Sequence, residues 1–306
     1  MNEIITANTL NTNNAYNSFV RYVDVSPKSR ATYSYNLKPF IAYLLTNGIT
    51  APTREDVLAY RESLRAEGKK ATTISAYLAV VRVFFDWLEN AGIYPNVARR
   101  VKGAKVSREF KKDYLTVAQI KNVVAPINCD TLSGARDYAV IALMSVCGLR
   151  TIEVARANVE DLQALGGKSV LYVQGKGENE KATFVIVPEA VERAIRAYLV
   201  KRGSYAPNAP LFACHSNNNK GGRLTTVSVS AIAKKAMVSA GYSSERLTAH
   251  SLRHSAITNA ILAGNSLQEA QTFARHANIA TTMIYNHAID KMKNQCAESV
   301  ASAIFG

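Results

Sequence analysis

Apolar residues in the first hundred positions recur with the 3.6-residue period of amphipathic helices. Between residues 33 and 45 they fall on one face of such a helix, and Gly48 is placed to end it. Thr53, followed three residues later by Asp56, is typical of a capping box and predicts a second helix over residues 54–66. The first part of the chain is therefore predicted to be helical.

A third helix is predicted to begin at Thr72 or Thr73 and to close before Gly92 and Pro95. Its apolar positions form a wide stripe, made by Ile74, Leu78, Val81, Phe84, Phe85, Trp87 and Leu88. A stripe of this width is typical of a helix that is buried in a core.

A basic segment follows this helical part. Residues 99–113 read RRVKGAKVSREFKKD, with few apolar residues and many cations. A solvated hinge and a segment that follows a phosphate backbone both fit this composition. Since 306 residues exceed the size at which one hydrophobic core usually stops growing, we expect two domains. We place a helical domain at residues 1–104, the linker at 105–113 and a second domain at 114–306.

The second domain is predicted to mix helices with a little sheet. A capping box at Thr116 and Gln119 opens it. Residues 170–174 and 182–187 are expected to pair as a hairpin with GKGENEK at its tip. The expected helices cover residues 135–146, 189–200, 228–240, 251–262 and 267–273, followed by an apolar tail helix that includes Met292, Ala297, Val300, Ala301, Ile304 and Phe305. The segment NNNKGG (217–222) is expected to be a flexible loop. The fold class is mainly α with a small β-sheet.

Charge and cysteine content narrow the class of protein. The chain has 37 Lys and Arg against 23 Asp and Glu, a formal net charge of +14, which favours a nucleic-acid partner. No long apolar run, basic amphipathic helix or signal-peptide core supports a membrane partner. The cysteines form no CxxC pair, so we expect small packing residues and a reducing cytoplasm. They are Cys129, Cys147, Cys214 and Cys296.

Side chains that can carry chemistry gather in the second domain: Arg150, Glu153, Lys176, His250, Arg253, His254, His276 and Tyr285. Singly, each has an ordinary explanation, because most of the fifteen tyrosines should be packing groups. His250 and His254 lie one helical turn apart, as in some zinc sites. The Glu of HExxH and a third ligand are absent from the pattern, so no metal is expected.

As an ordered set, these residues resemble the tyrosine recombinases, the phage integrase and Xer-like family. The resemblance rests on GLRTIEV (148–154), Lys176, HSLRH (250–254), His276 and IYNH (284–287). It covers nearly the whole chain, because the N-terminal part is similar to the helical, SAM-like core-binding domain of that family. It implies a DNA-binding domain and a mixed α/β catalytic domain that close around duplex DNA. One departure is Ala274-Arg275, where many relatives have Leu-Gly, and it leaves the local packing open.

The resemblance implies that Arg150 and Arg253 hold the non-bridging oxygens of the scissile phosphate. A planar guanidinium suits that task, since it can donate two parallel hydrogen bonds. Tyr285 is the implied nucleophile. A phenol is ionised in about one molecule per thousand at neutral pH, so it needs help, and His250 is expected to take the phenolic proton or to act through hydrogen bonding.

Other members of the set have supporting roles in the same comparison. Lys176 is expected to be the general acid that protonates the leaving 5′ oxygen, with Lys181 close enough to be the acid instead. His276 donates to the phosphate or orients Tyr285. Glu153 is expected to fix local structure.

The implied activity is site-specific recombination of double-stranded DNA. Attack by Tyr285 would leave a 3′-phosphotyrosyl bond and a free 5′-hydroxyl, and a 5′-hydroxyl of the partner duplex would reverse the step, through a Holliday junction. The covalent bond conserves the energy, so no metal, ATP or other cofactor is expected. Four protomers on DNA follow, with the tail helix docked on a neighbour or packed on its own domain. The need for accessory proteins stays open.

The biological role stays open between integration or excision of a mobile element and resolution of replicon dimers, in the cytoplasm of a bacterium and at its nucleoid. Two other classes fit part of the pattern. A type IB topoisomerase uses the same tyrosine chemistry to relax supercoils, and a DNA-binding protein without catalysis would share the charge but not the reaction.

Overall fold

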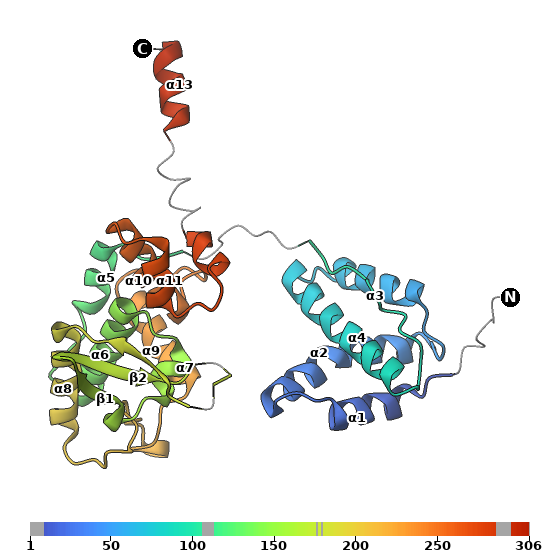
Figure 1. Cartoon of the computed structure of the whole chain (residues 1–306), viewed down its shortest axis with the longest axis horizontal. Coiled ribbons are helices and arrows are strands. Elements are labelled where there is room, and N and C mark those ends of the chain that lie inside the picture. Colours follow the sequence, from blue (N-terminus) through green and yellow to red (C-terminus); the bar gives the residue numbers. More distant parts are fainter. Residues whose placement is uncertain (1–8, 106–112, 176, 179, 286–294, 306) are drawn as a thin grey trace. The chain divides into compact units, whose positions relative to one another are not determined.

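The computed structural model describes residues 9–105, 113–175, 177–178, 180–285 and 295–305. The chain forms two compact units, residues 1–108 and 109–306, each with its own hydrophobic core (Figure 1).

The first unit is helical in its described part. It contains α1 (Thr12–Tyr22), α2 (Pro27–Thr46), α3 (Arg54–Ala66) and α4 (Ala71–Asn90). The last three confirm the helices that periodicity predicted, and both halves of the capping box at Thr53 and Asp56 are present. Helix α1 was not predicted.

Aromatic rings hold this unit together. Phe19 of α1 meets Phe84 of α4 edge to face at 5.4 Å between ring centroids, and Phe40 of α2 meets Tyr60 of α3 at 5.1 Å. Such contacts add to the burial energy of the rings. Helix α4 is long and apolar enough to cross a membrane, but side chains along it, Phe84 and Phe85 included, are buried in this core. Its composition is therefore that of a core helix.

The start of the basic segment belongs to the first unit. Arg82 of α4 donates to the carbonyl of Val101 at 2.8 Å, and Arg61 of α3 donates to that of Lys102 at 3.2 Å. The Ser75 hydroxyl donates to the carbonyl of Ala104 at 3.0 Å. Residues 101–104 are thus bound along α3 and α4 rather than forming a solvated hinge.

The second unit mixes helices with one small sheet. Its elements, in order, are α5 (Val117–Val124), α6 (Leu132–Cys147), α7 (Thr151–Arg156), β1 (Leu162–Leu165), β2 (Lys168–Val173), β3 (Thr183–Ile186), α8 (Glu189–Arg202), α9 (Thr226–Ser239), α10 (Ala249–Leu262), α11 (Leu267–Ala274) and α13 (Cys296–Phe305), with single 3-10 turns at Val159–Asp161 and Asn217–Asn219. Residues 280–285 are also helical. The predicted helices are confirmed, the tail helix in its described part, Cys296–Phe305, while Met292 lies outside the described residues. Helix α7 and strand β1 were not predicted.

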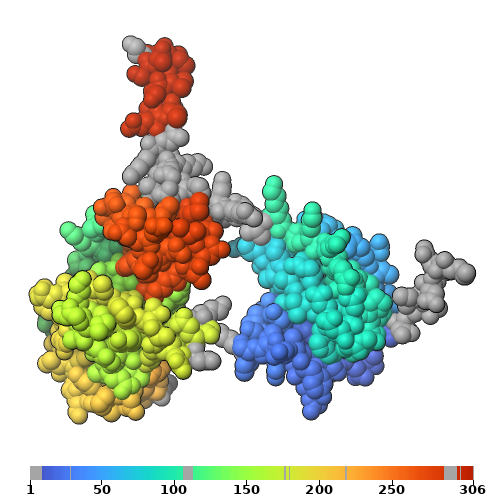
Figure 2. All heavy atoms as spheres, in the orientation of Figure 1, coloured from blue at the N-terminus to red at the C-terminus, as the bar shows by residue number. Residues whose placement is uncertain are grey.

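The sheet is an antiparallel meander in the order β1-β2-β3. Leu171 pairs with Val185, which confirms the predicted hairpin. Helix α6 contacts α7, α8, α9 and α10, so it lies at the centre of the unit. In the space-filling view, the orange segment around α10 and α11 lies directly against the yellow-green body of the same unit (Figure 2).

One smaller expectation needs correction. Cys147 is buried as expected, but Cys129 and Cys296 are exposed, so the cysteines are not all packing residues. The loop at 217–222 is held at its base, where Cys214 donates to Gly222 at 2.7 Å and Gly221 donates to Cys214 at 2.8 Å, and its expected flexibility stays a prediction.

Candidate active site

The site is built where two helices end and a third begins. Helix α6 stops at Gly148, whose φ is +62°, and Arg150 is the N-cap of α7. A Cβ at position 148 would lie 3.1 Å from the ring of Phe273, so both the space and the backbone conformation favour glycine there. The carboxylate of Glu153 accepts the backbone N–H of Arg150 at 2.7 Å. This turn fixes where the Arg150 side chain leaves the backbone.

Arg253 lies inside the protein. It comes from α10, is 1% exposed, and donates to the carbonyls of Gly148 and Ala274, at the ends of α6 and α11. Helix C-termini are favourable places for a cation. Burial, and then the charges of Arg150 and Arg275, lower the pKa of Arg253 to about 9, so the group is still a cation at neutral pH.

Arg150 is more accessible. Its side chain is 30% exposed and donates to Oε1 of Glu153 at 2.8 Å and to the carbonyl of Arg275 at 3.3 Å. The arginine pair that the sequence predicted therefore lies together, with one guanidinium at the surface and one beneath it.

Tyr285 lies against the same group. The residue is 4% exposed and packs with Ile257 and Ala274. Its hydroxyl shares a hydrogen bond with Nδ1 of His254. Burial raises the pKa of Tyr285 to about 12, although the charges of Arg253 and Arg150 act to lower it. In this state the phenol is protonated at neutral pH. To become a nucleophile it needs a base that takes its proton and positive charge that stabilises the phenolate.

Two imidazoles occupy one face of α10. The rings of His250 and His254 lie edge to face at 4.3 Å between centroids. The sequence predicted His250 as the base, while the contact with the Tyr285 hydroxyl is made by His254. Sequence reasoning weighed His254 only as a metal ligand, although its place one turn from His250 was the signal. Among the described residues, no group of three or more His, Cys, Asp or Glu could hold a metal ion.

His276 lies beside the tyrosine. Its ring stacks at 6.3 Å on Tyr285, and its Nδ1 shares a hydrogen bond of 3.0 Å with the hydroxyl of Thr282. Burial and then the charges of Arg253 and Arg150 lower the pKa of His276 to about 4, so the imidazole is neutral. Thr282, fully buried, was missed by sequence reasoning, which has no signal for an ordinary threonine.

The expected acid, Lys176, lies outside the described residues. The backbone of its neighbour Gly175 is held from both sides, because its carbonyl accepts from Arg156 and its N–H donates to Glu178, each at 2.8 Å. The alternative acid, Lys181, pairs with Asp161 at 2.5 Å. Lys181 is therefore engaged in a partly buried ion pair.

Similarity to known proteins identifies the family of this chain. The profile of the phage integrase family matches residues 113–292, and the profile of the phage integrase N-terminal SAM-like domain matches residues 16–92. The chain belongs to the phage integrase family, the tyrosine recombinases. The predicted family is confirmed.

Relatives of this phage integrase family member match it along most of their length. It is 31% identical to the tyrosine recombinase XerC of Thermodesulfovibrio yellowstonii, over 72% of this chain and 73% of that protein. It is 28% identical to XerA of Pyrococcus furiosus, over 92% and 91%. The solved structure of the XerH site-specific recombinase bound to palindromic difH substrate matches with a TM-score of 0.74 at 22% identity, over 90% of this chain and 80% of that one.

A lambda integrase dimer bound to a COC′ core site matches with a TM-score of 0.68 at 17% identity, over 90% of this chain and 97% of that one. These structural likenesses show that this integrase family member has the tyrosine recombinase fold. The predicted fold class, mainly α with a small sheet, is therefore confirmed.

Proposed function

We propose that this chain is a site-specific DNA recombinase and that Tyr285 is its nucleophile. The phenolic oxygen attacks a phosphodiester, the bond to the 5′ oxygen breaks, and the DNA is left as a 3′-phosphotyrosyl ester with a free 5′-hydroxyl. A 5′-hydroxyl of the second duplex then attacks the ester, releases Tyr285 and joins the exchanged strands through a Holliday junction. Because the ester conserves the energy of the broken bond, we propose that neither a metal ion nor ATP takes part.

One observation carries this proposal: the hydroxyl of Tyr285 lies among cations and imidazoles inside one unit. Arg150 at the surface and Arg253 beneath it are suited to a phosphate whose equatorial oxygens gather charge as the bond breaks. His276 is neutral in this state. If its Nδ1 accepts the hydroxyl hydrogen of Thr282, its Nε2 carries the proton and is a donor for the same phosphate.

The proton of the tyrosine has a defined route. The His254 ring is in contact with the hydroxyl, and His250 is its next neighbour. We propose that this pair accepts the phenolic proton. His254 is the first acceptor, because it contacts the hydroxyl, and His250, which the sequence pattern predicted as the base, is the second member of the pair. A phosphate anion bound at Arg150 would raise the basicity of nearby imidazoles, because it offsets the surrounding positive charge.

Covalent trapping tests the proposal. The full chain first selects its binding sequence from a pool of duplexes with a randomised centre. The selected duplex is then nicked at successive positions. Cleavage beside a nick releases a short fragment, and the 5′-hydroxyl that would reverse the reaction is lost with it. We expect a covalent adduct on this nicked duplex, stable to denaturant, and peptide mapping should place it on Tyr285. An adduct on another residue, or none on any bound duplex, would contradict the proposal.

A second experiment asks which lysine is the acid. We expect Lys176→Ala to slow cleavage by a factor of about 10²–10⁴, typical for loss of a general acid. When sulfur replaces the bridging 5′ oxygen, the leaving thiolate needs no proton, so Lys176→Ala should cleave this substrate at close to the wild-type rate. Lys181→Ala is the matched control. If Lys181→Ala shows this rescue and Lys176→Ala does not, Lys181 is the acid.

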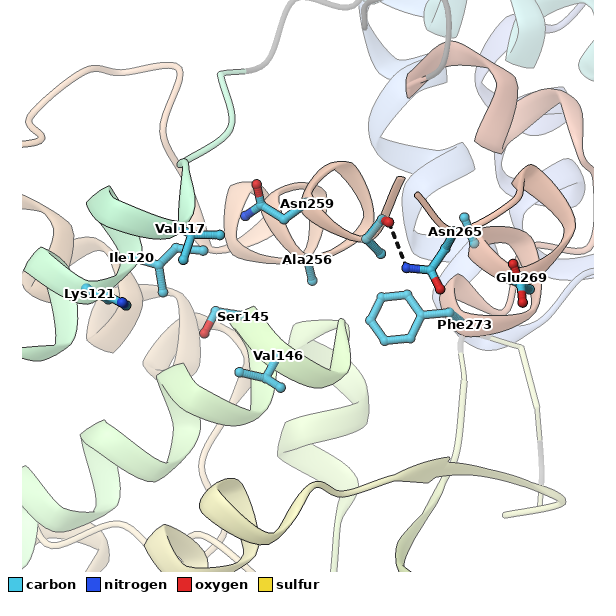
Figure 3. Close-up of a pocket in the computed structure, with 12 residues that line it drawn as sticks. Val117, Ile120, Lys121, Ser145, Val146, Ala256, Asn259, Asn265, Glu269 and Phe273 are labelled. Carbon is cyan, nitrogen blue, oxygen red and sulfur yellow. Dashed lines mark hydrogen bonds between the residues drawn. The ribbon is translucent and has the colours of Figure 1, made fainter. Parts of the chain in front are cut away.

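We further propose four protomers on the DNA, linked by their tails. The tail helix α13 exposes apolar side chains, with Ile304 66% and Phe305 86% exposed. An apolar cavity of about 530 Å³ lies between α5, α6, α10 and α11, beside the aromatic ring of Phe273 (Figure 3). Its lining includes Val117 and Val146, both more than two-fifths exposed. We propose that α13 of a second copy occupies this cavity.

Removal of residues 300–306 is expected to leave binding of single protomers to the selected duplex intact and to weaken the higher assemblies, because an apolar contact is lost. Val117→Glu should have the same effect from the cavity side. Glu is favourable in the first turn of α5, so the fold should tolerate it. Val200→Glu, on the exposed face of α8, is the control. Sedimentation of the DNA complexes measures assembly, and a lower melting temperature with unchanged assembly would show that the tail packs on its own protomer instead.

The place of the activity follows from its substrate. We propose that the protein acts on a DNA recombination site in the cytoplasm, at the bacterial nucleoid. Integration or excision of a mobile element and resolution of replicon dimers both use the chemistry described above. Sequencing the DNA ends that the protein joins would separate these roles, because the ends belong to a mobile element in the first and to two copies of one replicon in the second.

A further inference from the structure

Arg275 occupies a backbone conformation that arginine rarely takes. It is the C-cap of α11, with φ of +55° and ψ of +48°, in the left-handed region. This region costs a residue with a Cβ roughly 1–2 kcal/mol, and glycine is usual there. The conformation turns the Arg275 carbonyl toward Arg150 and leaves that of Ala274 for Arg253. The backbone at 274–275 thus holds both members of the arginine pair.

The side chain points inward rather than to solvent. It is 12% exposed and donates from Nη2 to Oε2 of Glu153 at 2.8 Å and to the carbonyl of Gly148 at 3.2 Å. Its Nη1 donates to the carbonyl of Phe273 at 2.9 Å, while its Nε has no hydrogen-bond partner among the described residues. Arg275 is therefore an internal group, and its contacts with Glu153 and Gly148 outweigh an unpaired N–H and an unfavourable φ.

Glu153 is shared between two arginines. Its carboxylate is 1% exposed, Oε1 accepts from Nη1 of Arg150, and Oε2 accepts from the Arg150 backbone and from Arg275. Without Arg275, Arg150 would be the one arginine left hydrogen-bonded to this carboxylate among the described residues. A guanidinium that is fully paired with a carboxylate has less capacity to bind a phosphate.

We propose that Arg275 is a positioning residue for Arg150: by taking one oxygen of Glu153 and presenting its own carbonyl, it fixes the orientation of Arg150 and leaves it charge for the scissile phosphate. This inference rests on the proposed recombinase function and deepens it. Arg275 itself does not touch DNA; it acts through Glu153.

The test compares Arg275→Gly with Arg275→Lys in the full chain, on the selected nicked duplex at saturating concentration. Glycine suits the left-handed position, so Arg275→Gly should stay folded, as its melting temperature will show. We expect it to cleave about tenfold more slowly, within the range of coupling between contacting groups, with an unchanged dissociation constant. Arg275→Lys keeps the charge but cannot make the same set of hydrogen bonds to Glu153, Gly148 and Phe273, and it should be intermediate. Arg193→Ala, which removes an exposed arginine from its ion pair with Glu189, is the control.

Coupling to Glu153 separates positioning from a general structural effect. In a Glu153→Gln background, Arg275→Gly should reduce the cleavage rate much less than in the wild-type background. Equal reductions in both, a wild-type rate for Arg275→Gly, or a loss of DNA affinity that matches the loss of rate would overturn the inference. Absence of cleavage by the wild-type chain would overturn the proposed function as well, so the two failures are distinguishable.

The pH dependence gives an independent readout. Burial by itself would raise the pKa of Glu153, but the charge of Arg275, the backbone hydrogen bond from Arg150, the side-chain hydrogen bond from Arg275 and the charge of Arg150 outweigh it, so the net pKa is lowered. Arg253 of α10 also faces this carboxylate. Without Arg275 the pKa of Glu153 should rise, so Glu153 should be protonated, and stop orienting Arg150, at a higher pH in Arg275→Gly than in the wild type. As the solution is acidified, the cleavage rate of Arg275→Gly should therefore begin to fall at a higher pH. Identical acid limbs would count against the inference.

Discussion

Replacement of Tyr285 by phenylalanine is expected to abolish the covalent adduct while DNA binding persists. The substitution removes one oxygen, the atom that would form the bond to phosphorus, and leaves the ring in its contacts with Ile257 and Ala274. The lost hydrogen bond to His254 should change the free energy of unfolding by only about 1 kcal/mol. A denaturing gel measures the adduct on the nicked duplex, and a binding assay under the same conditions measures DNA affinity. Denaturant unfolding measures the change in the free energy of unfolding.

Tyr205→Phe is the matched control for this prediction. Tyr205 lies in the same unit, is 38% exposed and stacks with Arg202 away from the site. It should retain the wild-type rate. An adduct formed equally well by Tyr285→Phe would remove the proposed mechanism, whereas loss of DNA binding in that variant would show that the phenyl ring no longer holds its place.

The sequence predicts a helix where the apolar residues recur with the helical period and the same residues are the ones buried in the structure. In α4 the stripe predicted from the sequence includes Ile74, Phe84 and Leu88, which are buried in the core. Helix α1 reads TNNAYNSFVRY, and its Asn and Thr residues have weak helix propensity. Its position depends on the ring of Phe19, which packs on α4. Contacts distant in sequence therefore stabilise α1, and local pattern cannot show them.

Short elements were missed for a related reason. Strand β1 has four residues, partly or largely exposed, and is defined by its pairing with β2. Helix α7 has six residues and follows directly on the turn at Gly148. Neither is long enough to show a period, so the partner, rather than the sequence of the element, sets the structure.

In the site, motif order predicted that the arginine pair, the histidines and Tyr285 meet, but not which atoms touch, and the place of Lys176 stays a prediction. His250 and His254 share one face of α10, and the position of the helical segment at 280–285 decides which of them reaches Tyr285. Similarly, the side chain at position 275 could have been solvated or directed at DNA. The left-handed backbone and the buried carboxylate of Glu153 turn it inward. Both outcomes depend on packing between segments more than twenty residues apart.

Replacement of Arg253 by methionine is expected to reduce cleavage by a factor of about 10³ or more, within the range seen when an arginine that stabilises a phosphoryl-transfer state is removed. Methionine fills much of the same volume but cannot donate to phosphate. Arg253→Lys should also be strongly impaired, since a single ammonium cannot reproduce the two-pronged geometry of a guanidinium. Arg196→Ala, on the exposed face of α8, should cleave like the wild type. Single-turnover rates on the nicked duplex measure these differences.

The same substitution should leave the melting temperature of the DNA-free protein within a few degrees of the wild type, because two opposing effects are of similar size. The pKa of Arg253 is lowered to about 9, so below that pH the folded state carries a buried cation at a penalty of several kcal/mol, which methionine removes. The carbonyls of Gly148 and Ala274 then lose their donor, at about 1–3 kcal/mol each. Bound DNA supplies the anion that offsets the cation, so the wild type should gain more thermal stability from the selected duplex than Arg253→Met does. An equal gain in both proteins would show that Arg253 supports the core and not the phosphate.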